Sequence, residues 1–254
     1  LTASRATTLT TLTTAPSNSS PVYSEVEEAV RTLAYLHRNF RTAPKEGREN
    51  FREESLEEEL TRKNAELKRV RKFMRSRRRK TEFEQEFLNH FEGFYGEAEA
   101  ALEAARSRGL RVLYEKSLAE GWLCHGDYNQ HNVVFSREGV TVVNFLNFSY
   151  QIRVSDLSNF VRKMMEKNNW NTSLGMELIG AYDSVRKLKP QELSYLYFYL
   201  AYPEKFWKIA NHYSHSHKAW LSGRNTEKLS KVVAQEGARE HFLQTLAGKV
   251  ENRI

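Results

Sequence analysis

The sequence predicts a mainly helical fold with one small β-hairpin. Apolar residues recur at helical spacing through most of the chain, and two such stretches follow a serine or threonine with glutamate three residues later. Two short apolar runs flank a turn at residues 136–139. A serine or threonine with glutamate three residues later caps the start of a helix, and two short apolar runs around a turn are typical of paired strands.

Residues 1–24 are rich in threonine and serine and carry no apolar repeat, which predicts a mobile tail. A first helix is expected from Glu25, with Ser24 as its N-cap and Glu27 completing a capping box. Its apolar stripe is Val26, Ala29, Val30, Leu33 and Leu36. Pro44 and Gly47 end this element, and a charged helix follows over about residues 53–75.

The next helix is expected over residues 81–105, behind a second capping box formed by Thr81 and Glu84. Its stripe, which is typical of a buried face, is Phe83, Phe87, Phe91, Phe94, Ala98 and Leu102. Gly109 closes this helix. A shorter helix over about residues 112–120 ends at Gly121.

The hairpin is predicted from strands at 132–135 and 140–145, joined by a turn whose Gly139 can adopt a positive φ. The chain is then expected to be helical again. Four helices are predicted: one opened by Asp156, one from Pro190, one from Pro203 to about 222–223, and one over about 226–247.

The segment His125–Asn132 reads H-x-D-x-x-x-x-N directly before the first strand of the hairpin. Kinase-like phosphotransferases have this spacing in their catalytic loop, where the aspartate accepts the proton of the attacking hydroxyl and the asparagine reaches Mg²⁺. These positions are Asp127 and Asn132. Gly126 beside the aspartate is closer to small-molecule phosphotransferases than to protein kinases. The alternative is a loop in which these residues only cap local structure.

The segment Cys124–Asn132 resembles the aminoglycoside phosphotransferase and choline kinase class, and resembles the CotS-type proteins of bacterial endospore coats more closely. Later stretches similar to the CotS-type proteins are Arg162–Trp170, Ala181–Arg186, Pro203–Asn211 and Ser222–Asn225. The resemblance covers about residues 25–248. It implies a kinase-like C-terminal lobe over 25–254, synthesis in the mother-cell cytoplasm, location in the spore coat and other coat proteins as partners.

The resemblance also implies roles for individual residues. Asp127 would be the base, Asn132 and Asn144 would bind Mg²⁺ and the nucleotide ATP, and His125 and Asp156 would brace the loop. Asn144 departs from the pattern, because the class has aspartate there. A neutral amide oxygen in place of a carboxylate weakens metal binding roughly tenfold or more.

A complete kinase-like enzyme has an N-terminal lobe of strands with a glycine-rich phosphate loop. The sequence contains no G-x-G-x-x-G, and residues 1–24 are too few for five strands. We therefore expect the N-terminal lobe to be absent from this chain, either because the chain is a fragment or because the lobe was lost or replaced, and ATP to have half of its pocket.

The formal net charge is +7, and residues 68–80 form a strongly basic run. This run could bind nucleic acid or another polyanion. The alternative is the solvated end of a helix balanced by the acidic residues 53–59 at its start.

Other features exclude some classes of protein. The sequence has no apolar run near 18 residues and no signal peptide, so neither a membrane span nor secretion is expected. The single cysteine, Cys124, excludes an intramolecular disulfide and is interpreted as a buried residue rather than a reactive thiol. His212, His215 and His217 are interpreted as a polar helix surface, with a zinc site as the alternative.

Three hypotheses follow. The first is a kinase-fold spore coat protein with a binding or assembly role and weak or absent catalysis. The second is an active phosphotransferase that uses ATP and Mg²⁺ on a hydroxyl acceptor. The third is a polyanion-binding protein that acts through residues 68–80.

Overall fold

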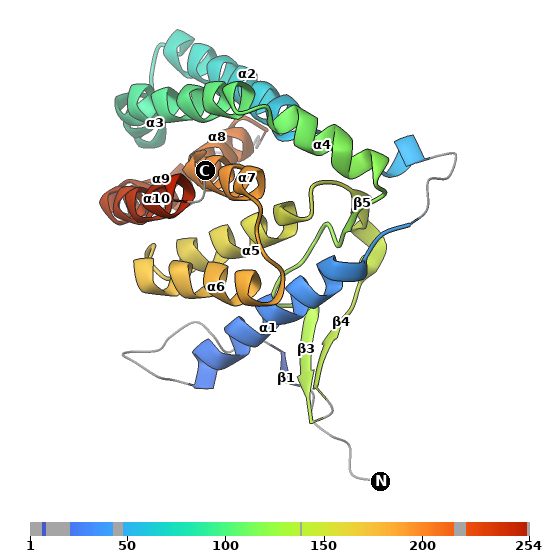
Figure 1. Ribbon diagram of the computed structural model, residues 1–254. Helices are drawn as coiled ribbons and strands as arrows, with labels where there is room; N and C mark the ends of the chain where they lie inside the picture. The colour runs from blue at the N-terminus through green and yellow to red at the C-terminus, as the bar shows by residue number, and fades with distance from the viewer. Residues whose placement is uncertain (1–6, 9–20, 43–47, 138, 216–221, 253–254) are drawn as a thin grey trace.

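The computed structural model describes residues 7–8, 21–42, 48–137, 139–215 and 222–252. Helices make up most of this part of the chain, with two small antiparallel sheets beside them (Figure 1). The helices are α1 (Pro21–Asn39), α2 (Leu56–Ser76), α3 (Glu82–Ser107), α4 (Leu110–Ala119), α5 (Val154–Lys167), α6 (Thr172–Val185), α7 (Pro190–Ala201), α8 (Glu204–His215), α9 (Ser222–Ala234) and α10 (Glu236–Glu251). Two 3-10 turns are η2 (Arg48–Phe51) and η3 (Phe145–Asn147).

The predicted hairpin is present, but its second strand ends at Val142 and not at residue 145, because Asn144 is left-handed and residues 145–147 form η3. Strands β3 (Val133–Ser136) and β4 (Gly139–Val142) pair antiparallel, with Val133 opposite Val142 and Ser136 opposite Gly139. Strand β1 (Thr7–Thr8) pairs with the other edge of β3, so two residues of the predicted tail form a strand. A second small sheet joins β2 (Leu123–Cys124) to β5 (Ser149–Tyr150).

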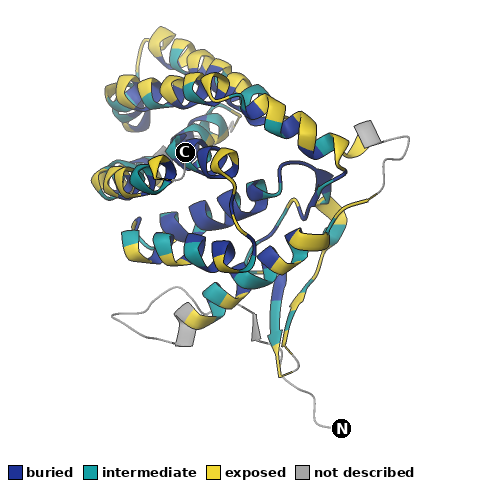
Figure 2. Ribbon diagram, viewed as in Figure 1, coloured by how far each residue is buried: buried dark blue, intermediate teal, exposed yellow. Residues whose placement is uncertain are grey.

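The apolar stripes predicted from the sequence face the core. Helices α2 and α3 pack together at one side of the molecule, and α1 packs on α6 at the other (Figures 1 and 2). Phe87 and Phe94 of α3 stack on Phe206 of α8, with ring centroids 4.8 and 4.5 Å apart. Leu36 is only half-buried, whereas the rest of the α1 stripe is buried. None of the helices among the described residues has both the length and the apolar character needed to cross a membrane.

The capping box of Thr81 and Glu84 is confirmed: the Glu84 backbone N–H donates to Thr81 Oγ1, and Thr81 N donates back to the Glu84 carboxylate at 2.8 Å. The predicted N-cap at Ser24 is wrong, because α1 already begins at Pro21 and Ser24 lies inside the helix. Proline suits the first turn of a helix, because its fixed φ is close to the helical value and the N–H that it lacks has no partner there. The charged helix begins at Leu56 rather than near residue 53, behind an unpredicted capping box of Ser55 and Glu58.

Three predictions for the C-terminal half need correction. Helix α5 begins at Val154, so Asp156 lies in its first turn and does not open it. The helix expected to reach residues 222–223 ends at His215, and residues 216–221 lie outside the described part. The helix expected over 226–247 is two helices, α9 and α10, divided at Gln235. The side chain of Gln235 donates to the backbone oxygen of Glu166. The other predicted tail residues, 1–6 and 9–20, also lie outside the described part.

Candidate active site

The loop from His125 to Asn132 connects β2 to β3, and its path requires glycine at position 126. Gly126 has a φ of +78°, and a Cβ atom built there would lie 1.8 Å from the backbone oxygen of Asn147. No side chain fits at that distance, and L-residues disfavour that φ. The arginine that protein kinases carry at this point of the motif is therefore sterically excluded here.

Asp127, Asn132 and Asn144 converge on one site, as their positions in the loop and hairpin predict. The Asp127 carboxylate is 36% exposed and accepts hydrogen bonds from Asn129 Nδ2 at 2.7 Å and from Asn132 Nδ2 at 3.1 Å. Lys163 Nζ of α5 lies 3.8 Å from Asp127 Oδ1. The carboxylate is thus held in one orientation and remains reachable from solvent, as a base that receives a proton must be.

Asn144 adopts the left-handed conformation, with φ 65° and ψ 59°, directly after β4. Its Nδ2 donates to Asn132 Oδ1 at 3.3 Å, so the two amides bond to each other. Because an amide has one carbonyl oxygen, this bond engages the oxygen with which Asn132 would bind a metal. Mg²⁺ prefers charged oxygen ligands in octahedral geometry, and Asp127 is the single carboxylate among these three side chains. The donor set fits a divalent cation poorly.

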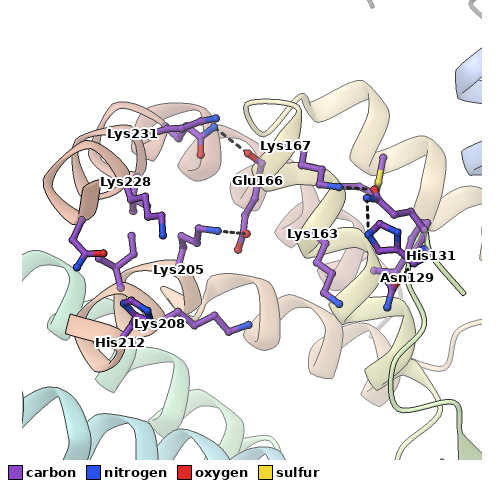
Figure 3. A pocket seen from close by; sticks show the side chains of 17 residues that line it. Asn129, His131, Lys163, Glu166, Lys167, Lys205, Lys208, His212, Lys228 and Lys231 are labelled. Atoms are coloured by element: carbon purple, nitrogen blue, oxygen red, sulfur yellow. Dashed lines mark hydrogen bonds and ion pairs between the residues drawn. The ribbon is translucent and has the colours of Figure 1, made fainter. Parts of the chain in front are cut away.

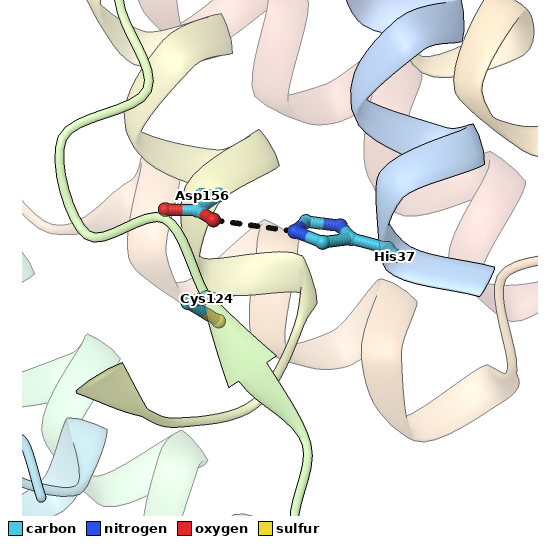
Figure 4. A group of neighbouring side chains, drawn as sticks. All are labelled: His37, Cys124 and Asp156. Atoms are coloured by element: carbon cyan, nitrogen blue, oxygen red, sulfur yellow. Dashed lines mark hydrogen bonds and ion pairs between the residues drawn. The ribbon is translucent and has the colours of Figure 1, made fainter. Parts of the chain in front are cut away.

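Asp156 ties the loop to the core. Its buried carboxylate accepts the backbone N–H of His125 at 2.6 Å and that of Gly126 at 3.0 Å. A third donor is His37 Nε2 of α1, at 3.2 Å (Figure 4). These bonds are those that the resemblance implies for the aspartate after the hairpin. Hydrogen bonds to a charged carboxylate are stronger than those between neutral groups, so the two bonds from the loop hold it firmly against α5.

His37 was not predicted from the sequence. Its Nδ1 accepts from the Tyr182 hydroxyl at 2.8 Å, and Arg186 Nη1 donates to the same hydroxyl at 3.1 Å. Burial lowers the pKa of His37, although Asp156 acts in the opposite direction. A neutral ring with its proton on Nε2 satisfies both bonds. The sequence signal that could have found His37 is its spacing of four residues from Leu33, which places it on the buried face of α1.

His125 lies behind Asp127 and is fully buried. Its Nδ1 accepts the backbone N–H of Asp127 at 3.2 Å, and its Nε2 donates to the backbone oxygen of Val143 at 2.9 Å. The first bond fixes the backbone at Asp127. The second joins the loop to the end of β4, just before Asn144.

The prediction that Cys124 is buried is confirmed, and burial raises the pKa of its thiol well above the ordinary value. Cys124, His37 and Asp156 bring three ligand atoms within 4.8 Å of one another (Figure 4). Both carboxylate oxygens and both ring nitrogens already form the hydrogen bonds described above. We therefore interpret this cluster as part of the bracing and not as a metal centre.

The basic run at residues 68–80 and the histidines of α8 both lie away from the loop in sequence. In the basic run, Lys68 pairs with Glu99, Arg71 with Glu92 and Arg77 with Glu84, all on α3. The acidic partners of these three cations thus come from α3 and not from residues 53–59, which the sequence suggested would balance the run. His215 Nδ1 bonds to the backbone oxygen of Asn211 within α8, and His217 lies outside the described residues.

A cavity of about 680 Å³ opens beside the loop, and the sequence did not predict it (Figure 3). Asn129 and Lys163, which both contact Asp127, line it together with residues of α5, α8, α9 and the loop. Its most frequent lining residue is lysine. The cavity and Asp127 thus share two side chains.

The chain is similar to a protein family, to a curated relative and to a solved structure. A family described as "Spore coat putative kinase YutH" matches residues 7–246. Spore coat protein S of Bacillus subtilis (strain 168) is 24% identical over 166 residues, which are 65% of this chain and 47% of that protein. The chain thus spans about half the length of this curated relative.

One similar solved structure is the crystal structure of an aminoglycoside phosphotransferase from Alicyclobacillus acidocaldarius subsp. acidocaldarius DSM 446. It has a TM-score of 0.79 and 21% identity, and the match covers 91% of this chain and 67% of that chain. At this identity the likeness shows the fold alone. It agrees with the mainly helical body and small sheets described above.

Proposed function

Because the chain belongs to the YutH family of spore coat proteins, we propose that it has a binding or assembly role in the coat and that its phosphotransfer is weak or absent. It is a CotS-type, kinase-like spore coat protein. We propose other coat proteins as its partners, and synthesis in the mother-cell cytoplasm before it joins the coat.

The observation that carries the proposal is the amide pair of Asn132 and Asn144. Phosphoryl transfer depends on a metal ion that neutralises charge on the transferred phosphate. Asn144 supplies no charge, and its bond to Asn132 engages the other candidate ligand oxygen. Both features lower affinity for Mg²⁺, although the loop keeps its kinase-like geometry.

We propose further that the described residues correspond to the C-terminal lobe of the kinase-like fold. Apolar side chains are exposed beside the loop: Leu146 of η3 is 88% exposed, and Val143 and Phe51 are also exposed. An exposed apolar group of this kind is typical of a surface that another element covers. This edge is where a nucleotide-binding lobe packs in kinase-like folds.

A second candidate function is ATP- and Mg²⁺-dependent phosphotransfer to a hydroxyl. The observation that favours it is the held and half-exposed Asp127 carboxylate. In that reaction Asp127 would accept the proton of the acceptor hydroxyl, while Asn132 and Asn144 would turn their oxygens toward the metal. ATP and Mg²⁺ would be the nucleotide and cofactor.

Calorimetry with a non-hydrolysable ATP analogue separates the two functions, when it is run with and without Mg²⁺ and paired with an assay of phosphate release. The proposal predicts an affinity that Mg²⁺ changes less than about threefold, and no phosphate release above that of an Asp127→Ala variant. Strong Mg²⁺ dependence together with release that Asp127→Ala abolishes would establish the second function instead.

A further inference from the structure

The cavity beside the loop is lined by cations from three helices. Its six lysines are Lys163 and Lys167 of α5, Lys205 and Lys208 of α8, and Lys228 and Lys231 of α9. Figure 3 shows Lys163, Lys205, Lys208 and Lys228 extending into one shared space. Among the described lining residues Glu166 is the one acid, and it is already paired with the buried Arg162 and with Lys205.

The lysines are not fully neutralised by the protein. Lys163 has Asp127 at 3.8 Å, and Lys208 has Glu204 at 3.1 Å. The described part of the chain gives Lys228 and Lys231 no carboxylate within 4.0 Å. Burial, with neighbouring cations, lowers the pKa of Lys163 and of Lys208. Like charges gathered in a hollow repel one another, and an anion in that hollow removes the repulsion.

Asn225 supplies a second and independent observation. It lies in the first part of α9, lines the cavity and is 1% exposed. Its Nδ2 has no hydrogen-bond partner among the described residues. A buried amide donor without a partner is destabilising, so a ligand oxygen that accepts from it is favoured. Apolar side chains complete the wall: Phe160, Met164, Ile209 and Val232.

We propose that this cavity binds a small ligand with two or more anionic groups, phosphate or carboxylate, on a compact carbon body. A volume of about 680 Å³ fits a small molecule. Cations on three helices suit separated anionic groups, and the apolar wall suits the carbon body. Asn129 and Lys163 place such a ligand next to Asp127, so a hydroxyl on it would lie beside the loop. The inference concerns binding and holds whether or not phosphoryl transfer occurs.

Calorimetry with three probes tests the proposal: pyrophosphate, citrate and a hexaglutamate peptide. We expect a small anion to bind, with an affinity that falls as salt rises. Pyrophosphate and citrate identify phosphate or carboxylate as the preferred group. Tighter binding of hexaglutamate than of either small anion would overturn the proposal in favour of an acidic protein segment, and binding of none of the three would also overturn it.

Matched variants locate the site. Lys205→Gln with Lys228→Gln should weaken binding at least tenfold, whereas Lys68→Gln with Lys72→Gln removes the same charge from the basic run and should change it less than twofold. An equal loss of affinity in both double variants would refute the cavity as the binding site. Asn225→Ala should weaken binding several-fold, because it removes the Nδ2 donor that has no partner among the described residues. Unchanged affinity in Asn225→Ala would contradict the part assigned to this amide.

Discussion

Replacing Asp156 with asparagine should destabilise the protein strongly, because the carboxylate accepts three N–H donors in a buried site. The donors are the backbone of His125 and Gly126 and the ring of His37, at 2.6, 3.0 and 3.2 Å. In Asp156→Asn one oxygen becomes an NH₂ group, which faces these donors instead of accepting from them. Losing a hydrogen bond to a charged group costs about 1.5–3 kcal/mol, and leaving a buried donor unpaired costs about 1–3 kcal/mol.

The sum is about 4 kcal/mol, a large share of the roughly 5–15 kcal/mol that stabilises a typical protein. With a urea slope of about 2 kcal/mol per molar, the midpoint of unfolding should fall by about 2 M. Asp127→Asn is the matched control, because it makes the same chemical change in a half-exposed carboxylate of the loop that Asp156 braces. The control should lose less than about 1 kcal/mol, as exposed polar groups usually do. Equal midpoints for the two variants would refute the bracing role of Asp156.

Two further predictions concern the same loop. Gly126→Ala should lower the free energy of unfolding by about 2–4 kcal/mol, because the residue has a positive φ and its new Cβ would lie 1.8 Å from the backbone oxygen of Asn147. The control is Gly96→Ala on α3, where a Cβ meets open space. It should be neutral or stabilising in the same urea titration. Burial holds the pKa of His37 below its ordinary value of 6.5, so the unfolded chain binds the proton first. The contribution of His37 to stability should be complete above pH 6.5 and fall by up to about 1.4 kcal/mol per pH unit below it. In urea titrations from pH 7.5 to 5.5, the free energy of unfolding should therefore fall less steeply with pH in His37→Gln than in the natural sequence. An equally steep fall in both proteins would contradict this.

Local sequence patterns predicted most of the fold. The phenylalanines of α3 recur at helical spacing, and the box of Thr81 and Glu84 marks the start of that helix, so both signals lie within a few residues. The start of α1 was misplaced because two local signals compete, Pro21 and Ser24, and a short window does not rank them.

Part of the candidate site was predictable from the sequence and part was not. Asp127, Asn132 and Asn144 were predictable, because a loop and the hairpin that follows it bring them together. The bracing of Asp156 by His37 joins residues 119 apart, and the bond from His37 to Tyr182 spans 145. The lysines of the cavity come from α5 and, after two intervening helices, from α8 and α9. No local pattern specifies such pairs, because they form only when the helices pack.

The central claim is that Asn144 makes the loop a poor metal site, and Mn²⁺-induced broadening of backbone NMR signals tests it directly. Mn²⁺ substitutes for Mg²⁺, and its broadening identifies nearby residues even when binding is weak. With an ATP analogue and increasing Mn²⁺, the account predicts no selective loss of signals from residues 125–132 in the natural sequence. It predicts selective loss in Asn144→Asp, where a carboxylate replaces the amide. Selective broadening of this loop at the same low Mn²⁺ concentration in both proteins would contradict the account.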